Sequence, residues 1–139
     1  MDASRDDATY RRLAQADAME RRRLAEVAQA AALVREFVAD AVAAGVEPER
    51  LTARTYDGKA RYRTDLTGWY LKHDRSVAVG VDGEFYVLSV PSSLRGRLSG
   101  AQVPPAEPPL ELGKGGRDGE SMPMRQALQQ RLEAGNSWS

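Results

Sequence analysis

The feature that most constrains this chain is an uninterrupted helical pattern over residues 5–44. The stretch contains neither glycine nor proline and is rich in Ala, Leu, Arg and Glu, which favour helices. Ser4 and Asp7 have the spacing of an acidic capping box at its start, and Gly45 and Pro48 predict its end. Such a helix is about 60 Å long at 1.5 Å per residue. A compact domain made from the remaining residues has a radius of gyration of only about 12 Å. The rest of the chain therefore cannot cover the whole helix.

An apolar seam follows this helix in alternating steps of three and four residues, as in a coiled coil, and only Asp17 and Glu20 interrupt it. The apolar face widens in the second half. We therefore expect residues 24–44 to pack on the sheet and residues 5–23 to project. A helical hairpin within the chain is the alternative, but no other helical pattern is long enough to pair with all of the seam. The sequence favours a second copy of the chain or a helical partner protein, in parallel or antiparallel orientation. The residues predicted to form this interface are Tyr10, Leu13, Leu24, Val27, Ala31 and Val34.

Arginines gather on the projecting half of the helix. A basic helix can follow a nucleic-acid backbone. However, Asp7 and Asp17 each precede an arginine by four residues, which favours salt bridges on a solvated helix face. The candidate nucleic-acid contacts are Arg11, Arg12, Arg21, Arg22 and Arg23.

The overall composition excludes several classes of protein. The chain has 20 basic and 20 acidic residues, so no net field attracts nucleic acid or an anionic membrane. It has no cysteine, which excludes disulfide frameworks and thiolate chemistry. Its N-terminus is charged, unlike a secretory signal, and no apolar stretch is as long as a membrane span. We expect a cytoplasmic protein that requires no cofactor.

Beyond the long helix the hydrophobic pattern changes to a period of two, which predicts an antiparallel meander. A two-residue loop at Asp82-Gly83 and a short loop after Lys72 would place Gly80 between Trp69 and Phe85. In that arrangement the aromatic rings cover the bare glycine. We expect the long helix to cover one face of the sheet and the C-terminal segment to cover the other. The predicted strands are residues 52–56, 59–64, 67–72, 77–81 and 84–90, with a further turn signal at Asp57-Gly58.

In the C-terminal third, the sequence predicts a helical turn at residues 92–98 and a proline-rich extended connection at residues 101–109. An edge strand at residues 110–112 and a final helix at residues 123–134 are expected to follow. The predicted fold class is α+β: a long N-terminal helix, a small antiparallel meander of three to five strands, and a short C-terminal helix. The expected organisation is a helical segment at residues 1–46, a small α+β domain at 47–135 and a tail at 136–139.

The glycine-dense stretch at residues 113–121 precedes the last helix. Backbone N–H groups in such a loop can bind a phosphate or a carboxylate. The stretch lacks the P-loop pattern and the βαβ context of a dinucleotide site, which favours an ordinary surface loop. Its candidate anion-binding residues are Lys114, Gly115, Gly116 and Arg117.

A catalytic site is not indicated. His73, Asp74 and Ser76 include the three residue types of a hydrolase triad, but residues of one tight turn do not converge on a reacting atom. A single histidine without cysteine also makes a poor metal site. Aromatic and basic residues of the meander resemble, in composition only, a sheet that stacks bases, although the inferred register favours a packed core. These residues are Tyr62, Trp69, Tyr70 and Tyr86 with Arg61, Arg63 and Lys72.

The sequence thus favours a non-enzymatic module for protein–protein interaction, forming a homo-oligomer through its N-terminal helix. The alternative is a nucleic-acid-binding accessory protein that uses the helix arginines and the basic hairpin. Anion or phosphate handling at residues 113–121 is a weaker alternative.

Overall fold

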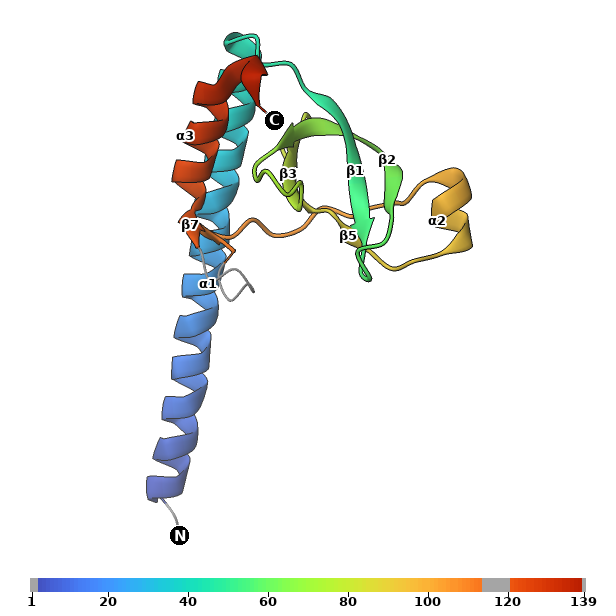
Figure 1. The fold of residues 1–139 in the computed structure, drawn as a ribbon. Helices are drawn as coiled ribbons and strands as arrows, with labels where there is room; N and C mark the ends of the chain where they lie inside the picture. Colours follow the sequence, from blue (N-terminus) through green and yellow to red (C-terminus); the bar gives the residue numbers. More distant parts are fainter. Residues whose placement is uncertain (1–2, 114–120, 139) are drawn as a thin grey trace.

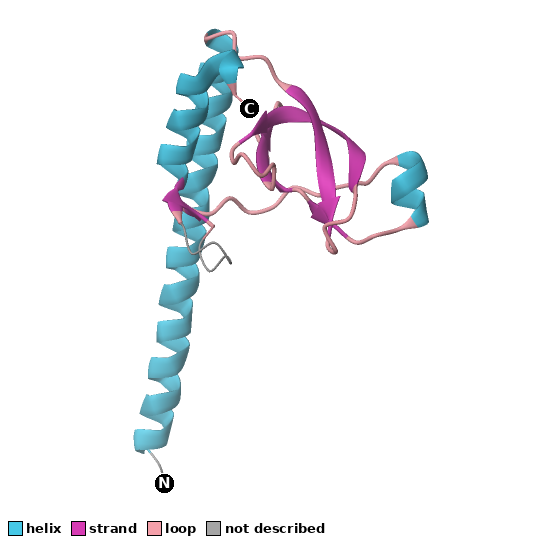
Figure 2. Cartoon of the chain, in the orientation of Figure 1, coloured by secondary structure: helices cyan, strands magenta, loops and turns pink. Residues whose placement is uncertain are grey.

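The computed structural model describes residues 3–113 and 121–138. Its fold is α+β, as predicted: a long N-terminal helix, a five-stranded, mostly antiparallel sheet and a short C-terminal helix (Figure 1 and Figure 2). The helices are α1 (Ala3–Ala43), α2 (Leu94–Ser99) and α3 (Met124–Ala134), with a 3-10 turn η1 (Gly135–Ser137). The strands are β1 (Glu49–Thr55), β2 (Arg61–Tyr70), β3 (Val77–Gly80), β4 (Phe85–Val87), β5 (Ser89–Val90), β6 (Glu111–Leu112) and β7 (Met122–Pro123).

The long helix ends as its sequence predicts. Gly45 has a φ of 72°, and its N–H donates to the carbonyl of Val42 at 3.2 Å. The next N–H, from Val46, donates to the carbonyl of Ala41 at 2.9 Å, which completes a Schellman motif. The predicted N-terminal cap is wrong in position, because Ser4 already lies within α1.

The sheet closes on itself as a small barrel. Its strand order is β4-β3-β2-β1-β5, with β1 and β5 parallel and the other pairs antiparallel. Leu88 alone separates β4 from β5, so one bent segment pairs with β3 at one end and with β1 at the other. Figure 1 shows the curled sheet beside the upper half of α1. The barrel has its own buried interior, formed by Leu51, Ala53, Tyr62, Tyr70, Ala78, Tyr86, Leu88 and Val90.

A second core joins the outer face of the barrel to the helices. Trp69 is fully buried there, and its ring meets that of Phe37 edge to face with centroids 5.5 Å apart. Its indole N–H donates to the carbonyl of Val46 at 3.0 Å. Met124, Ala127 and Leu128 of α3 belong to the same core. The C-terminal helix therefore lies beside α1, and the prediction that it covers the opposite face is wrong. The inner face needs no such cover because barrel closure buries it.

α3 runs parallel to α1, because the connection after α2 passes the lower part of the barrel and reaches α1 before the chain turns upward (Figure 1). At the upper end the side chain of Asn136 ties the two together: it donates to the carbonyl of Gly45 and accepts from the N–H of Glu47, at 3.1 Å and 2.7 Å. Residues 101–109 form the extended connection expected from their prolines, and Ala106 bridges to Phe85. The predicted edge strand is present as β6, which pairs with β7.

The predicted register of the central strands is wrong by one residue. Trp69 and Phe85 lie on either side of Val79 rather than of Gly80, and Gly80 faces Gly68. Both loops hold one more residue than assumed. The loop at 81–83 ends with Gly83 at a φ of 83°, as in a three-residue hairpin loop with a bulge. The loop at 72–76 contains a left-handed residue, Arg75, with a φ of 59°.

Candidate functional site

The first candidate surface is the part of α1 that neither the barrel nor α3 covers. Full burial on α1 begins at Ala30, and residues 4–26 are exposed except for Ala8, which is half-buried. Of the predicted interface residues, Tyr10, Leu13 and Leu24 have 74%, 65% and 49% of their surface exposed. Val27 and Ala31 are half-buried, and Val34 belongs to the chain's own core. The exposed seam is therefore confined to the lower half of the helix.

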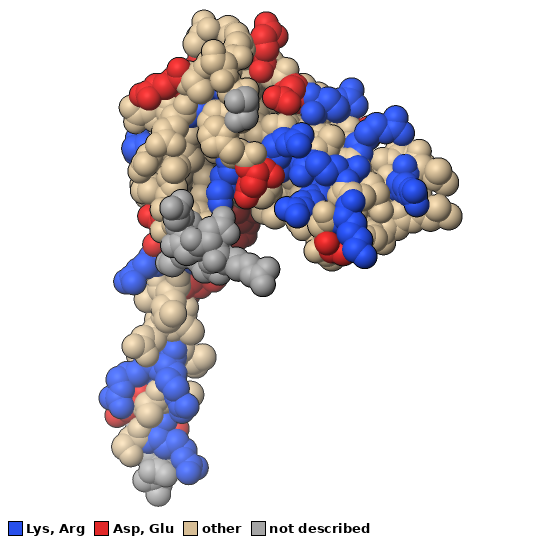
Figure 3. All heavy atoms as spheres, in the orientation of Figure 1, with Lys and Arg blue, Asp and Glu red and all other residues tan. Residues whose placement is uncertain are grey.

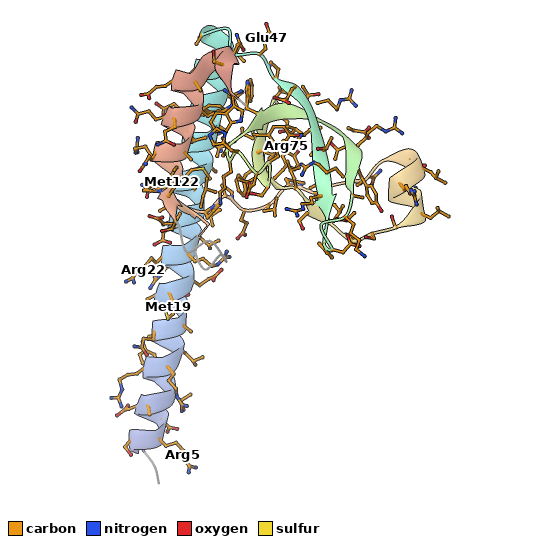
Figure 4. The ribbon with its side chains drawn as sticks, viewed as in Figure 1. Arg5, Met19, Arg22, Glu47, Arg75 and Met122 are labelled. Carbon is orange, nitrogen blue, oxygen red and sulfur yellow. The ribbon has the colours of Figure 1, made fainter. Side chains whose placement is uncertain are left out.

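Met19 adds an apolar side chain that the seam pattern does not include. It is 67% exposed and lies with Arg22 on the projecting part of α1 (Figure 4). The sequence alone could identify it only as an apolar residue between two charged seam positions, Asp17 and Glu20.

The helix arginines divide into paired and unpaired groups. Arg21 lies 3.5 Å from Asp17, as predicted. Arg23 bridges Glu20 at 2.9 Å and Glu107 of the extended connection at 2.6 Å. The hydrogen bond from Arg23 is the main cause of a lowered pKa at Glu20, and the same bonds raise the pKa of Arg23. The pair predicted between Asp7 and Arg11 does not form within 4.0 Å. In the described part of the chain, no carboxylate pairs with Arg11, Arg12 or Arg22.

The second candidate surface is the outer face of β1 and β2. Side chains alternate along both strands, so the positions between the buried residues point outward. Arg54 and Arg61 lie directly opposite each other, and Thr52 lies opposite Arg63. Figure 3 shows basic side chains gathered over the barrel. The outward arginines of the two strands are Arg50, Arg54, Arg61 and Arg63.

These barrel arginines contact neutral groups. The Nε of Arg61 donates to the hydroxyl of Thr52 at 2.8 Å, and its Nη2 reaches the carbonyls of Thr52 and Arg75 at 3.2 Å and 3.3 Å. The Nη1 of Arg50 donates to the carbonyl of Thr64 at 3.2 Å. Among the described residues, no carboxylate lies within 4.0 Å of these guanidinium groups. No salt bridge therefore neutralises their charge, although the charge of Arg54 acts on Asp74 and contributes to lowering the pKa of that carboxyl.

A groove of about 520 Å³ opens between this face and α2. It contains one acidic side chain, Asp65. Arg95 of α2 lines it together with Arg50 and Arg63 of the strands. Its other polar lining comes from Thr64, Ser93, Ser99 and Gln102.

The remaining predicted site residues have structural roles or lie outside the described residues. Asp74 accepts hydrogen bonds from the N–H and hydroxyl of Ser76, which confirms the turn interpretation. The ring of His73 stacks on Trp138 with centroids 4.1 Å apart. The four meander aromatics Tyr62, Trp69, Tyr70 and Tyr86 are buried, so they are not available to stack on bases. The anion-loop candidates Lys114, Gly115, Gly116 and Arg117 lie outside the described residues.

Within residues 3–113 and 121–138, no group of three His, Cys, Asp or Glu side chains could hold a metal ion. Across the same residues, no helix has both the length and the apolar character that crossing a membrane requires. Comparison with protein-family models, curated proteins and solved structures gives no match. Function must therefore be argued from the two surfaces themselves.

Proposed function

We propose that this chain is a non-enzymatic interaction module that associates with a second copy of itself through the projecting part of α1. The observation that carries this proposal is the exposure of α1 before Val27, where Tyr10, Leu13 and Leu24 remain 49–74% exposed. Figure 1 and Figure 4 show this part of the helix extending away from the barrel.

The projecting segment can persist as a helix before any partner binds. Its upper turns are already fixed by packing in the core, so the unfavourable nucleation step is avoided. Ala-rich sequence and the pair between Asp17 and Arg21 add local support. A pre-formed helix does not pay ordering entropy on association, which lowers the cost of binding.

The expected affinity is modest. Only three large apolar side chains from each of two copies would become buried, and their burial must also offset the loss of translational and rotational freedom. Asp17 and Glu20 interrupt the seam and weaken it further. We therefore expect micromolar rather than nanomolar self-association.

Sedimentation velocity tests this proposal on the full chain. At about 100 μM, complexes with a micromolar Kd are saturated and the wild type should sediment as an oligomer. The double variant Leu13→Gln with Leu24→Gln should sediment as a monomer, because glutamine retains helix propensity but removes apolar surface. The control is Met19→Gln, an equally exposed apolar residue off the seam, which should still associate. A monomeric wild type at that concentration contradicts the proposal.

The other functions considered from the sequence receive less support. Acidic partners offset Arg21 and Arg23, which weakens the interpretation of α1 as a nucleic-acid-binding helix. A cytoplasmic location stays a prediction from the sequence.

A further inference from the structure

We propose that the groove between β1, β2 and α2 binds the phosphodiester backbone of single-stranded nucleic acid. The proposal rests on a surface distinct from the one used for self-association. Three arginines from three different elements line the groove, Arg50, Arg63 and Arg95, and only Asp65 opposes them.

The charge in this groove is available to a ligand. Arg50 contacts the carbonyl of Thr64, and no carboxylate within the described residues lies within 4.0 Å of the three guanidinium groups. On α1, in contrast, Arg21 and Arg23 are neutralised by neighbouring acids. Guanidinium groups present several N–H donors in a planar fork that matches phosphate oxygens.

The arrangement suits a ligand with regularly repeated charges. Arg61 and Arg63 are alternate residues of β2, so their Cα atoms are about 7 Å apart along the strand. Arg54 lies directly opposite Arg61 and extends the basic face beyond the groove. A single small anion could engage only part of this line of cations, whereas a phosphodiester chain can engage several in succession.

The groove is held in shape by close packing. A Cβ on Gly96 would lie 2.8 Å from the ring of Tyr62, so α2 sits directly on this ring. The hydroxyl of Tyr62 also donates to the carbonyl of Ser93 and accepts from its N–H, each at 3.1 Å. At the other end of α2, the N–H of Ala101 donates to the carbonyl of Arg63 at 2.7 Å. The arginines thus project from a fixed framework.

An exposed aromatic side chain beside the basic face favours a single strand over a duplex. The groove itself, with a volume of about 520 Å³, is large enough for part of a flexible strand. Tyr56, which is 71% exposed at the end of β1, offers an aromatic face near Arg54 on which an unpaired base can stack.

Fluorescence anisotropy with a labelled oligothymidylate of about 12 nucleotides tests the site on the full chain at about 50 mM salt. The triple variant Arg50→Gln, Arg63→Gln, Arg95→Gln should bind at least about tenfold more weakly than the wild type. The matched control replaces the three unpaired helix arginines Arg11, Arg12 and Arg22 with glutamine and should bind within about twofold of wild type. Asp65→Asn should bind more tightly, a gain that loss of folding cannot produce.

Salt and competitors distinguish the ligand class. With three phosphates contacted, affinity should fall about 20-fold between 50 and 200 mM salt. Equal or tighter binding to a duplex of the same length would overturn the single-strand assignment. Full competition by millimolar inorganic phosphate would show a small-anion site and would also overturn it. The proposal would also be overturned if the wild type did not bind the oligonucleotide, or if the control triple variant lost as much affinity as the groove variant. The monomeric Leu13→Gln, Leu24→Gln variant should bind the oligonucleotide with an unchanged affinity per groove. A failure of the self-association proposal can therefore be distinguished from a failure of the nucleic-acid proposal.

Discussion

Replacing Trp69 tests how α1 is fixed to the barrel. The side chain is fully buried, packs edge to face on Phe37, and donates its N–H to the carbonyl of Val46 at the end of α1. Trp69→Ala removes the ring and leaves a cavity, which costs about 3–5 kcal/mol in comparable cores. A domain of this kind has about 5–15 kcal/mol of total stability. The substitution should therefore remove a large fraction of it.

A second variant separates the ring from its hydrogen bond. Trp69→Phe keeps much of the apolar contact but leaves the Val46 carbonyl without its indole donor, which costs about 1–3 kcal/mol. Urea denaturation followed by far-ultraviolet circular dichroism measures both free energies. Tyr56→Ala is the control, since an exposed aromatic away from the core should change stability by only about 0.5 kcal/mol.

The free energy of unfolding should therefore be highest for the wild type, lower for Trp69→Phe and lowest for Trp69→Ala. A loss below about 1 kcal/mol for Trp69→Ala would mean that the ring is not a core residue. That result would refute the packing described here, and it would make Trp69 available for base stacking. Equal free energies for the wild type and Trp69→Phe would instead show that the bond to Val46 does not contribute.

Two further predictions concern the stability of glycine variants and the dependence of stability on pH. Gly68→Ala should cost about 3 kcal/mol or more, because its Cβ would lie 2.0 Å from the backbone oxygen of Val79. Gly45→Ala should cost only about 1–2 kcal/mol, the penalty of a left-handed conformation without a clash, and the same urea titration compares the two. Hydrogen bonds, chiefly from the Thr55 hydroxyl, lower the pKa of Asp57. At Asp74, burial raises the pKa, but hydrogen bonds from Ser76 outweigh it and lower the pKa overall. Their stabilisation is complete above the ordinary carboxyl pKa of about 4 and is lost as pH falls through the lower folded values. The urea midpoint should therefore drop between about pH 5 and pH 2, and less steeply in Asp57→Asn.

Local signals in the sequence predict the helices well. The long helix, its glycine-capped end and the C-terminal helix are all present with bounds close to those expected. These elements depend on residue propensities and on caps that lie within a few residues of one another. The α+β class follows from the change in hydrophobic period after α1.

The pairing of the strands was less accessible. The loop at 81–83 could hold two or three residues and the loop at 72–76 four or five, and the backbone angles at Gly83 and Arg75 decide between these lengths. One extra residue in a loop shifts the register of the paired strands by one, so that each side chain meets different cross-strand neighbours. Closure of the barrel depends on the bend at Leu88 and on the parallel pair β1–β5, which no local pattern reports. For the same reason, alternate arginines are visible in the sequence, but their shared outer face and the groove with α2 are not.

Our last prediction concerns how the two proposed surfaces combine. The exposed part of α1 before Val27 is about 35 Å long. In a parallel pair the two barrels, and hence the two grooves, lie at the same end of the assembly. In an antiparallel pair they lie at opposite ends, separated by the length of that part of the helix. A strand that reaches both grooves gains affinity through effective concentration, whereas one that reaches a single groove does not.

Oligothymidylates of increasing length, titrated against the wild type and the monomeric Leu13→Gln, Leu24→Gln variant, measure this gain. Parallel pairing predicts a wild-type advantage of at least about tenfold that begins with short strands. Antiparallel pairing predicts the same advantage only for strands long enough to span the exposed part of α1. Since the monomeric variant has one groove per particle, its affinity should rise only slightly with length in both cases. If the wild type is an oligomer yet shows the same length dependence as the variant, the two grooves do not act together, and the combined arrangement is wrong.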